Sequence, residues 1–225
     1  MEKSQKKSEN TKVLKDIKAV SFDFDDTLVN EKFWIKSKWE KTFDEYAFLS
    51  PDIKNTFFKI YQQRGPLYKF HVNDTLEALK IDKKFVKKIV SRFISIKEGE
   101  MLMEGAKDVL KILKSRGIKV GIITDGKKSR QEPRIKNAGI YDLVECIFYG
   151  NGKNEKKPAK GFDEKILKKF KIQSKEQFLY VGNDFLNDIE GMAEQGFRAC
   201  WVTEEKMGKA GKKIIKIKNL KELLN

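Results

Sequence analysis

Apolar and polar positions alternate with two different periods along the chain. Residues 17–24 form a short, mostly apolar run, which is typical of a strand buried in a parallel sheet. From residue 99 onward, further apolar runs alternate with stretches whose apolar residues recur at helical spacing. The runs predict strands at 118–126, 143–150, 178–184 and 198–203, and the stretches predict helices at 107–116, 131–138, 159–170 and 189–195.

This alternation of strands and helices predicts an α/β fold. Strand–helix–strand units connect parallel strands, so we expect a parallel sheet with helices on both faces. The core is predicted to comprise residues 17–30 and 99–225, after a polar tail at residues 1–16. The sequence contains no internal repeats.

Residues 31–98 show a helical pattern without strands. Aromatic and aliphatic side chains recur there every three or four residues, which predicts a series of packed helices. Because this block interrupts the sheet pattern after its first strand, we interpret it as an inserted helical cap. The only histidine, His71, lies in this block and is expected on its surface.

Composition narrows the class of protein further. Hydrophobic residues make up 40% of the 225 residues, which is enough for a core, and no apolar run reaches the roughly 20 residues of a membrane span. Two cysteines exclude a disulfide scaffold, and without an apolar signal segment we expect a cytoplasmic protein. The net charge of +15 comes mainly from lysines spread along the chain, a pattern that does not favour nucleic-acid binding as the main function.

Polar residues cluster where four of the predicted strands end, which is the ligand-binding edge of an open α/β sheet. The first cluster is Asp23-Phe24-Asp25-Asp26-Thr27. Asp23 and Asp25 would point the same way from an extended strand. Two carboxylates held close are costly unless a cation lies between them or one is protonated, and either state is useful in catalysis.

Two further clusters suit a phosphate group. Thr124, Asp125 and Gly126 offer a hydroxyl and backbone amides at the start of a helix. Lys157 precedes Pro158, which fits the first turn of the next helix, so the lysine can reach an anion at that helix entrance. Both features are common individually and gain weight from their order along the chain.

The fourth cluster begins at the end of the predicted strand at 178–184. It contains Asn183, Asp184 and Asp188, and the two aspartates, four residues apart, share one face of the following helix. Oxygen ligands of this kind suit Mg²⁺, which binds carboxylates and keeps several waters. The cluster therefore predicts a magnesium site.

In this order, over roughly residues 18–204, the four clusters resemble the motifs of the haloacid dehalogenase-like (HAD) superfamily. The segments DFDDTL and VGNDFLNDIEG are the specific ones. The resemblance implies a Rossmann-like parallel sheet, and the block at 31–98 is similar to the superfamily's type-one helical cap. It also implies a Mg²⁺-dependent phosphatase that acts on a small phosphorylated metabolite.

The resemblance assigns roles by position. Asp23 matches the nucleophile that forms an aspartyl-phosphate, and Asp25 matches the general acid/base. Thr124 matches the phosphate-binding hydroxyl, and Lys157 matches the lysine that stabilises the nucleophile and the transferring phosphoryl group. The implied phosphate site comprises Asp23, Thr124, Asp125, Gly126 and Lys157.

The implied metal site departs from the family's commonest pattern. In that pattern an aspartate directly follows the strand-end glycine, whereas here Gly182 is followed by Asn183 and the aspartate comes one residue later. Asn183 has the position and Asp184 has the charge, so both stay open as ligands. Asp188 is expected to orient Lys157 or a metal-bound water. The candidate metal ligands are Asp23, Asp25 through its backbone carbonyl, Asn183, Asp184 and Asp188.

Asp25 also separates branches of the superfamily. The dehalogenating branch resembles this chain in its nucleophile and cap but lacks an acid two residues further on, so Asp25 favours phosphoryl transfer. A phosphomutase, another HAD hydrolase and a non-catalytic basic binding protein remain the alternatives. Sugar phosphates, nucleoside monophosphates and phosphoglycolate are the candidate substrates. The cap residues that could select among them are Trp34, Arg64, Lys69, Phe70, His71 and Lys97.

Overall fold

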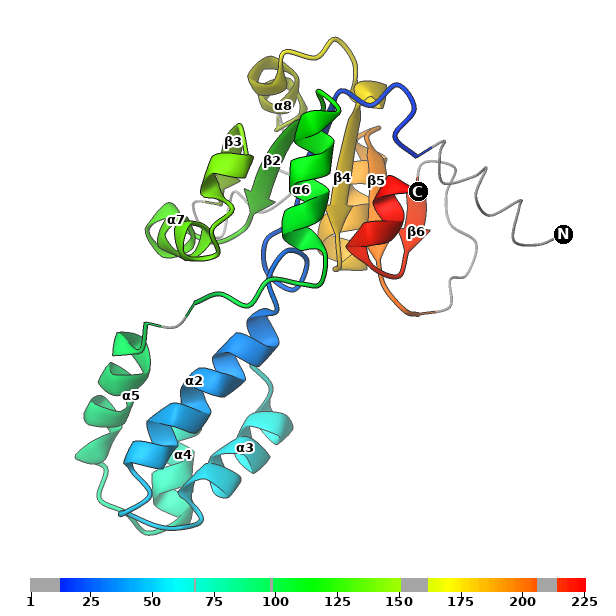
Figure 1. The fold of residues 1–225 in the computed structure, drawn as a ribbon. Coiled ribbons are helices and arrows are strands. Elements are labelled where there is room, and N and C mark those ends of the chain that lie inside the picture. Colours follow the sequence, from blue (N-terminus) through cyan, green and yellow to red (C-terminus); the bar gives the residue numbers. More distant parts are fainter. Residues whose placement is uncertain (1–12, 67, 98, 151–161, 206–213) are drawn as a thin grey trace, which may run out of the picture. The chain divides into compact units, whose positions relative to one another are not determined.

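Six parallel strands form one sheet in the computed structural model, which describes residues 13–66, 68–97, 99–150, 162–205 and 214–225 (Figure 1). The strands are β1 (Ala19–Phe22), β2 (Lys119–Thr124), β3 (Cys146–Tyr149), β4 (Phe178–Gly182), β5 (Arg198–Val202) and β6 (Ile214–Ile217). Their order is β3-β2-β1-β4-β5-β6, and every neighbouring pair is parallel. The predicted α/β, Rossmann-like fold is therefore confirmed.

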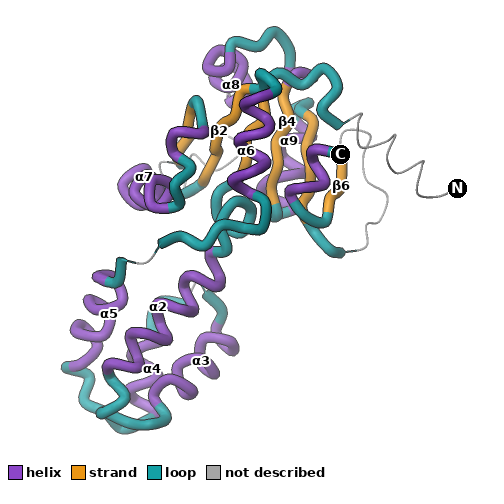
Figure 2. Tube along the Cα trace, in the orientation of Figure 1, coloured by secondary structure: helices purple, strands orange, loops and turns teal. Residues whose placement is uncertain are grey.

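Helices cover both faces of this sheet (Figure 2). Alternate strand residues point to opposite faces, so β1 sends Val20 and Phe22 into one apolar cluster and Ala19 into another. The first cluster includes residues of α6 (Ala106–Ser115), α7 (Lys128–Asn137) and η4 (Leu220–Leu224). The second includes residues of α8 (Phe162–Phe170), the π-helical turn η3 (Phe185–Glu190) and α9 (Gly191–Glu194). The short turns η1 (Tyr141–Leu143) and η2 (Lys175–Gln177) complete the connections.

The described chain divides into two compact units. One contains the residues up to Glu31 and those from Gly99, including the whole sheet, and the other contains Lys32–Glu98. The helices between residues 31 and 96 are α2 (Glu31–Glu45), α3 (Ile53–Arg64), α4 (His71–Ala78) and α5 (Phe85–Ser95). They enclose an apolar cluster of their own, built around Phe43, Ile53, Phe57, Val72, Leu76 and Ile89. No helix among the described residues is long and apolar enough to cross a membrane.

His71 is buried, so its predicted surface position is wrong. It is the first residue of α4 and only 7% exposed, one turn before the buried Thr75 on the same helix face. Its ring centroid lies 4.7 Å from that of Tyr61 and 5.1 Å from that of Tyr68. Burial lowers the pKa of His71, so the imidazole packs in its neutral form with the aromatic side chains of this unit.

Two parts of the sheet unit differ from the sequence prediction. The polar tail predicted at 1–16 ends earlier, because Val13 is buried and its carbonyl accepts a hydrogen bond from Arg198 Nη2 at 2.7 Å. Residues 1–12 lie outside the described residues. The sixth strand, β6, was not predicted, because Lys216 interrupts the isoleucines that form it.

The two cysteines are buried in strands, as their apolar surroundings predict. Cys146 lies in β3 and Cys200 in β5, and both thiols are free. Burial raises the pKa of Cys146 to about 12 and that of Cys200 further still. Both side chains thus act as small hydrophobic residues in the core.

Candidate active site

A pocket opens at the carboxyl ends of β1, β2 and β4. From β1 the chain adds β2 and β3 on one side, and then β4, β5 and β6 on the other side. The strand order therefore reverses between β1 and β4. Ligands bind outside such reversal points in open α/β sheets. The pocket has a volume of about 240 Å³ and is lined by Asp23, Asp25, Asp26, Thr124, Asp125, Gly126, Asn183, Asp184, Asn187 and Asp188.

Three of the four predicted polar clusters therefore meet in one pocket. They come from sequence positions 23–26, 124–126 and 183–188, which the parallel sheet brings to a common edge. The fourth cluster, which contains Lys157 and Pro158, lies outside the described residues.

Asp23 is fixed by the sheet itself. It directly follows β1, and its backbone N–H donates to the carbonyl of Val181 in β4 at 2.8 Å. Phe22, the residue before it, is paired with Ile122 on one side and Val181 on the other. Neighbouring strands on both sides thus hold the buried Asp23 carboxylate at the pocket floor.

A tight turn after Asp23 carries Asp25 to the pocket rim. The carbonyl of Phe24 accepts hydrogen bonds from the N–H groups of Leu28 and Val29, at 3.0 and 3.1 Å. Within this turn Asp26 has a φ of 56°, a left-handed conformation that aspartate adopts more readily than most residues. The Asp25 side chain remains 26% exposed, so it borders both the pocket and the protein interior.

Gln131 links Asp25 to Thr124. Its Nε2 donates to Asp25 Oδ2 at 2.6 Å and to Thr124 Oγ1 at 2.9 Å. The N–H of Gly126 also donates to Thr124 Oγ1, at 3.3 Å. Since this oxygen accepts two hydrogen bonds, its own O–H is the group left to donate. A side chain at Gly126 would collide with Gln131, which explains a glycine in this position.

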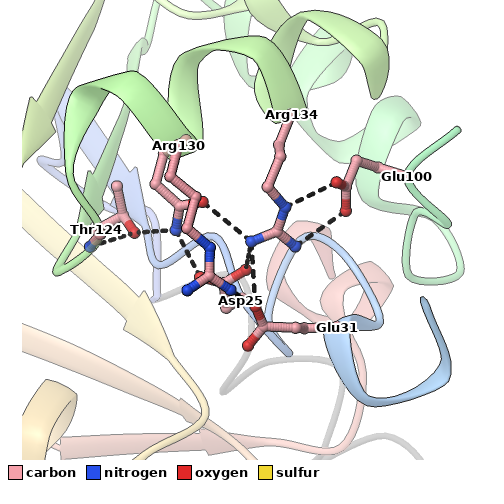
Figure 3. A network of polar contacts seen from close by, with 8 residues as sticks. Asp25, Glu31, Glu100, Thr124, Arg130 and Arg134 are labelled. Carbon is pink, nitrogen blue, oxygen red and sulfur yellow. Dashed lines mark hydrogen bonds and ion pairs between the residues drawn. The ribbon is translucent and has the colours of Figure 1, made fainter. Parts of the chain in front are cut away.

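Arg134 contacts Asp25 from the next turn of α7. Its Nη1 donates to Asp25 Oδ1 at 2.7 Å, while Nε and Nη2 donate to the two carboxylate oxygens of Glu100 at 2.7 and 3.0 Å (Figure 3). Burial lowers the pKa of Arg134, but the hydrogen bond to Glu100 and the charges of Asp25, Glu100 and Glu31 outweigh it, so the pKa is raised. The guanidinium is therefore charged throughout the working range of an enzyme.

None of the four predicted clusters contains Gln131, Arg134 or Glu100, so these site residues were not predicted. Gln131 and Arg134 are three residues apart, so they lie on one face of the predicted helix that follows the Thr124 cluster. That spacing was the available signal. Nothing in the sequence pairs Glu100 with this face.

The Asp188 carboxylate is held by hydrogen bonds at the carboxyl end of β4. Its Oδ1 accepts a hydrogen bond from the Tyr180 hydroxyl, and its Oδ2 accepts one from the N–H of Asp184, both at 3.1 Å. A Cβ at Gly182 would lie 2.6 Å from the Asp188 carboxylate. The glycine thus leaves the space that the buried carboxylate fills.

Asn183 and Asp184 face different partners. Asn183 Oδ1 accepts a hydrogen bond from Thr27 Oγ1 of the first motif at 3.1 Å. The Asp184 carboxylate accepts from the N–H of Asn187 at 3.0 Å and from its Nδ2 at 2.7 Å, and so caps the turn η3.

The side chains of this pocket fit a hard cation. Its carboxylate, amide and hydroxyl groups offer oxygen ligands, which Mg²⁺ prefers. Within the described part of the chain, no group of three or more His, Cys, Asp and Glu side chains is arranged to hold a metal. A cation here would therefore depend on a mixture of carboxylate, amide, backbone carbonyl and water oxygens, which is the coordination usual for Mg²⁺.

Comparison with known proteins identifies the family. The model of the haloacid dehalogenase-like hydrolases matches residues 20–202, so the chain belongs to this family of hydrolases. It is 27% identical over 193 residues to the glyceraldehyde 3-phosphate phosphatase of Pyrococcus abyssi. The aligned residues cover 82% of this chain and 81% of that protein. The corresponding phosphatase of Methanocaldococcus jannaschii is 27% identical over 190 residues, with 80% and 82% covered.

A solved structure has the same fold. The YfnB hydrolase of Bacillus subtilis, bound to magnesium, aligns with a TM-score of 0.66 and 21% identity, over 92% of this chain and 96% of that one. At this identity the likeness concerns the fold. The family match makes the chain an enzyme of the hydrolase class, and its relatives include phosphatases.

Proposed function

We propose that the chain is a Mg²⁺-dependent phosphatase that hydrolyses a small phosphorylated metabolite through an aspartyl-phosphate. The observation that carries the proposal is the pair Asp23 and Asp25 in one pocket with Thr124. Asp23 offers a buried nucleophile, Asp25 a partly exposed acid or base, and Thr124 a hydroxyl that can donate to a phosphate oxygen. The relatives named as phosphatases support the same reaction.

In the first step of the proposed reaction, an Asp23 oxygen attacks phosphorus and the bond to the leaving oxygen breaks. Asp25 gives its proton to that leaving oxygen. In the second step Asp25 takes a proton from water, the water oxygen attacks phosphorus, and the bond to Asp23 breaks to release phosphate. Bound Mg²⁺ would supply positive charge that offsets the repulsion between a phosphate dianion and the carboxylates. Lys157 is proposed to do the same from the phosphate side.

We infer that Asn183, rather than Asp184, is the ligand that the fourth motif offers to Mg²⁺. The inference is supported by the direction of the two side chains. Asp184 caps its own helical turn through Asn187, whereas the Asn183 amide oxygen is directed toward the first motif through Thr27. Asp23 and the backbone carbonyl of Asp25 are the proposed partners in that motif.

Substitutions at these two positions should separate the alternatives. We expect Asn183→Ala to raise the Mg²⁺ concentration for half-maximal activity by at least about tenfold, and Asp184→Ala to change it much less. Asn183→Asp should lower that concentration, because a carboxylate adds a full charge where an amide adds a dipole. The measurement is p-nitrophenyl phosphate turnover against Mg²⁺ concentration.

The opposite order of effects would make Asp184 the ligand. If neither alanine variant changed the Mg²⁺ response, the metal would be held by Asp188 or by residues outside this motif. Circular dichroism of each variant, compared with the unchanged chain, controls for loss of the η3 cap in Asp184→Ala.

We further propose that the unit at residues 32–98 is a cap that selects the substrate. Phe70 is 57% exposed there, and the Arg64 guanidinium lies 5.5 Å from the centroid of the Tyr68 ring. These side chains offer an aromatic surface and a positive charge to a phosphorylated compound. Buried His71 is not part of this proposal.

The experiment that tests the function is p-nitrophenyl phosphate hydrolysis with and without Mg²⁺, followed by a panel of phosphate esters. The panel comprises glyceraldehyde 3-phosphate, sugar phosphates, nucleoside monophosphates and phosphoglycolate. We expect Mg²⁺-dependent release of phosphate and a preference for a small ester such as glyceraldehyde 3-phosphate. Isomerised sugar phosphate without free phosphate would identify a phosphomutase. No turnover with any divalent metal would contradict the proposed phosphatase and favour the non-catalytic basic binding protein.

A further inference from the structure

A network of charged groups on α7 extends beyond the four motifs. We propose that Arg134 is a positioning residue that holds the Asp25 carboxyl group in the orientation needed to protonate the leaving oxygen. The inference rests on the proposed function, because it assumes that Asp25 delivers a proton during phosphate ester cleavage. It concerns a residue that none of the four motifs contains.

Both Asp25 oxygens accept hydrogen bonds from side chains of α7. Oδ1 accepts from Arg134 Nη1 at 2.7 Å and Oδ2 accepts from Gln131 Nε2 at 2.6 Å. A carboxylate that is 26% exposed would otherwise rotate about its Cβ–Cγ bond. Two donors on two different oxygens leave one orientation of the carboxylate plane.

Arg134 is itself held in place by several partners. Two of its nitrogens form a fork with Glu100, whose side chain is only 1% exposed. Nη1, the nitrogen that reaches Asp25, also donates to Gln131 Oε1 at 3.0 Å and to Glu31 Oε1 at 3.1 Å. The guanidinium carbon lies 5.2 Å from the centroid of the Phe24 ring. Such a bidentate, buried pair fixes the direction of the remaining donor.

A carboxyl group with a fixed orientation would favour the proton transfer. When the phosphorus–oxygen bond breaks, the electron pair stays on the leaving oxygen, and the Asp25 proton neutralises it. General acid catalysis needs the acid within hydrogen-bond reach of that oxygen, so a freely rotating carboxyl group would protonate it less often. Arg134 is thus assigned to orientation, and Asp25 to the chemistry.

The dependence of kcat/KM on the leaving group distinguishes a positioning role from a purely structural one. A p-nitrophenolate leaves readily without a proton, whereas a phenolate gains more from one. The two phenyl esters are similar in size, and kcat/KM covers the steps up to phosphoenzyme formation. Misplacing the acid should therefore lower kcat/KM for phenyl phosphate much more than for p-nitrophenyl phosphate.

The test variant is Arg134→Lys, which keeps the charge but cannot donate to Glu100 and Asp25 through one planar fork. We expect kcat/KM for phenyl phosphate to fall by about 100-fold or more, and that for p-nitrophenyl phosphate by less than about tenfold. An equal loss with both esters would overturn the proposal and leave Arg134 as a purely structural residue.

Arg130→Lys is the matched control. Arg130 lies one turn earlier on α7, and its hydrogen bond goes to Glu31 at 2.9 Å rather than to Asp25. Because this is an exposed ion pair, both esters should keep kcat/KM within about twofold. A shift of the ester ratio in this variant equal to that in Arg134→Lys would also overturn the proposal.

A second variant covers the case in which Arg134→Lys does not fold. The double substitution Arg134→Gln with Glu100→Gln removes both charges of the buried pair, so neither is left unpaired. The same ester ratio is measured, with the same two outcomes. If the unchanged chain hydrolyses neither ester in Mg²⁺, the proposed function itself has failed. A chain that hydrolyses both esters, with variants that lose them equally, refutes only the role of Arg134.

Discussion

Asp23→Asn is expected to remove essentially all phosphatase turnover while the fold stays intact. The amide has the same shape as the carboxylate, and the backbone hydrogen bond from residue 23 to Val181 does not involve the side chain. An amide oxygen is a much weaker nucleophile than a carboxylate, so the aspartyl-phosphate cannot form efficiently. We expect less than about a thousandth of the original p-nitrophenyl phosphate turnover in Mg²⁺.

The matched control for this variant is Asp16→Asn. Asp16 lies three residues before β1, at the opposite end of that strand from Asp23, and it is exposed. Its φ of 64° is a conformation that asparagine also tolerates. The control should keep its turnover, and both variants should keep the circular dichroism spectrum. Residual activity of Asp23→Asn above the stated level would rule out the covalent mechanism.

Removal of divalent metal is expected to abolish turnover, and added Mg²⁺ should restore it. Asp23, Asp184 and Asp188 line one small pocket, and the negative charge of these carboxylates opposes entry of a phosphate dianion. The measurement is p-nitrophenyl phosphate hydrolysis after EDTA treatment, and again after stepwise addition of MgCl₂. The same additions of Ca²⁺ test whether the site requires Mg²⁺, which is the smaller ion and demands octahedral coordination.

The chelated protein should still be folded. Asp188 is satisfied by Tyr180, and Asp184 by Asn187, so these carboxylates have hydrogen-bond partners from the chain itself. An unchanged circular dichroism spectrum in EDTA would separate loss of chemistry from loss of structure. Undiminished hydrolysis in excess EDTA would contradict the metal-dependent mechanism.

The central part of the fold was predictable because burial imposes a simple pattern. The strands at the centre of the sheet are covered on both faces, so they require apolar runs such as those ending at Phe22 and Val181. The edge strand β6 needs fewer apolar positions, and Lys216 within it obscured the apolar pattern. The predicted surface position of His71 was wrong for a related reason. Whether a histidine on a helix is buried depends on the aromatic side chains that pack around it, and not on its residue type alone.

The residues of the candidate site also include some that the sequence predicts and some that it does not. Asp23, Thr124 and Asn183 were found because parallel strands bring their carboxyl ends to one edge, whatever the loops do. The contact between Asp25 and Arg134 joins residues 109 positions apart and depends on how α7 packs on the turn after β1. The direction of the Asp184 side chain was equally hidden, because a helix cap and a metal ligand use the same residue type.

The position of Glu31 and Glu100 has a consequence for how such a protein can change during evolution. One stands just before the segment 32–98 and the other just after it, and both bind the guanidinium of Arg134. The core therefore ties together the two ends of this insertion with its own side chains. Because the entropy cost of closing a loop grows only slowly with its length, inserts of different size can be exchanged there at little cost. On the proposal that the unit at 32–98 selects the substrate, a different insert would change the specificity while Asp23 and Thr124 stay where the sheet holds them.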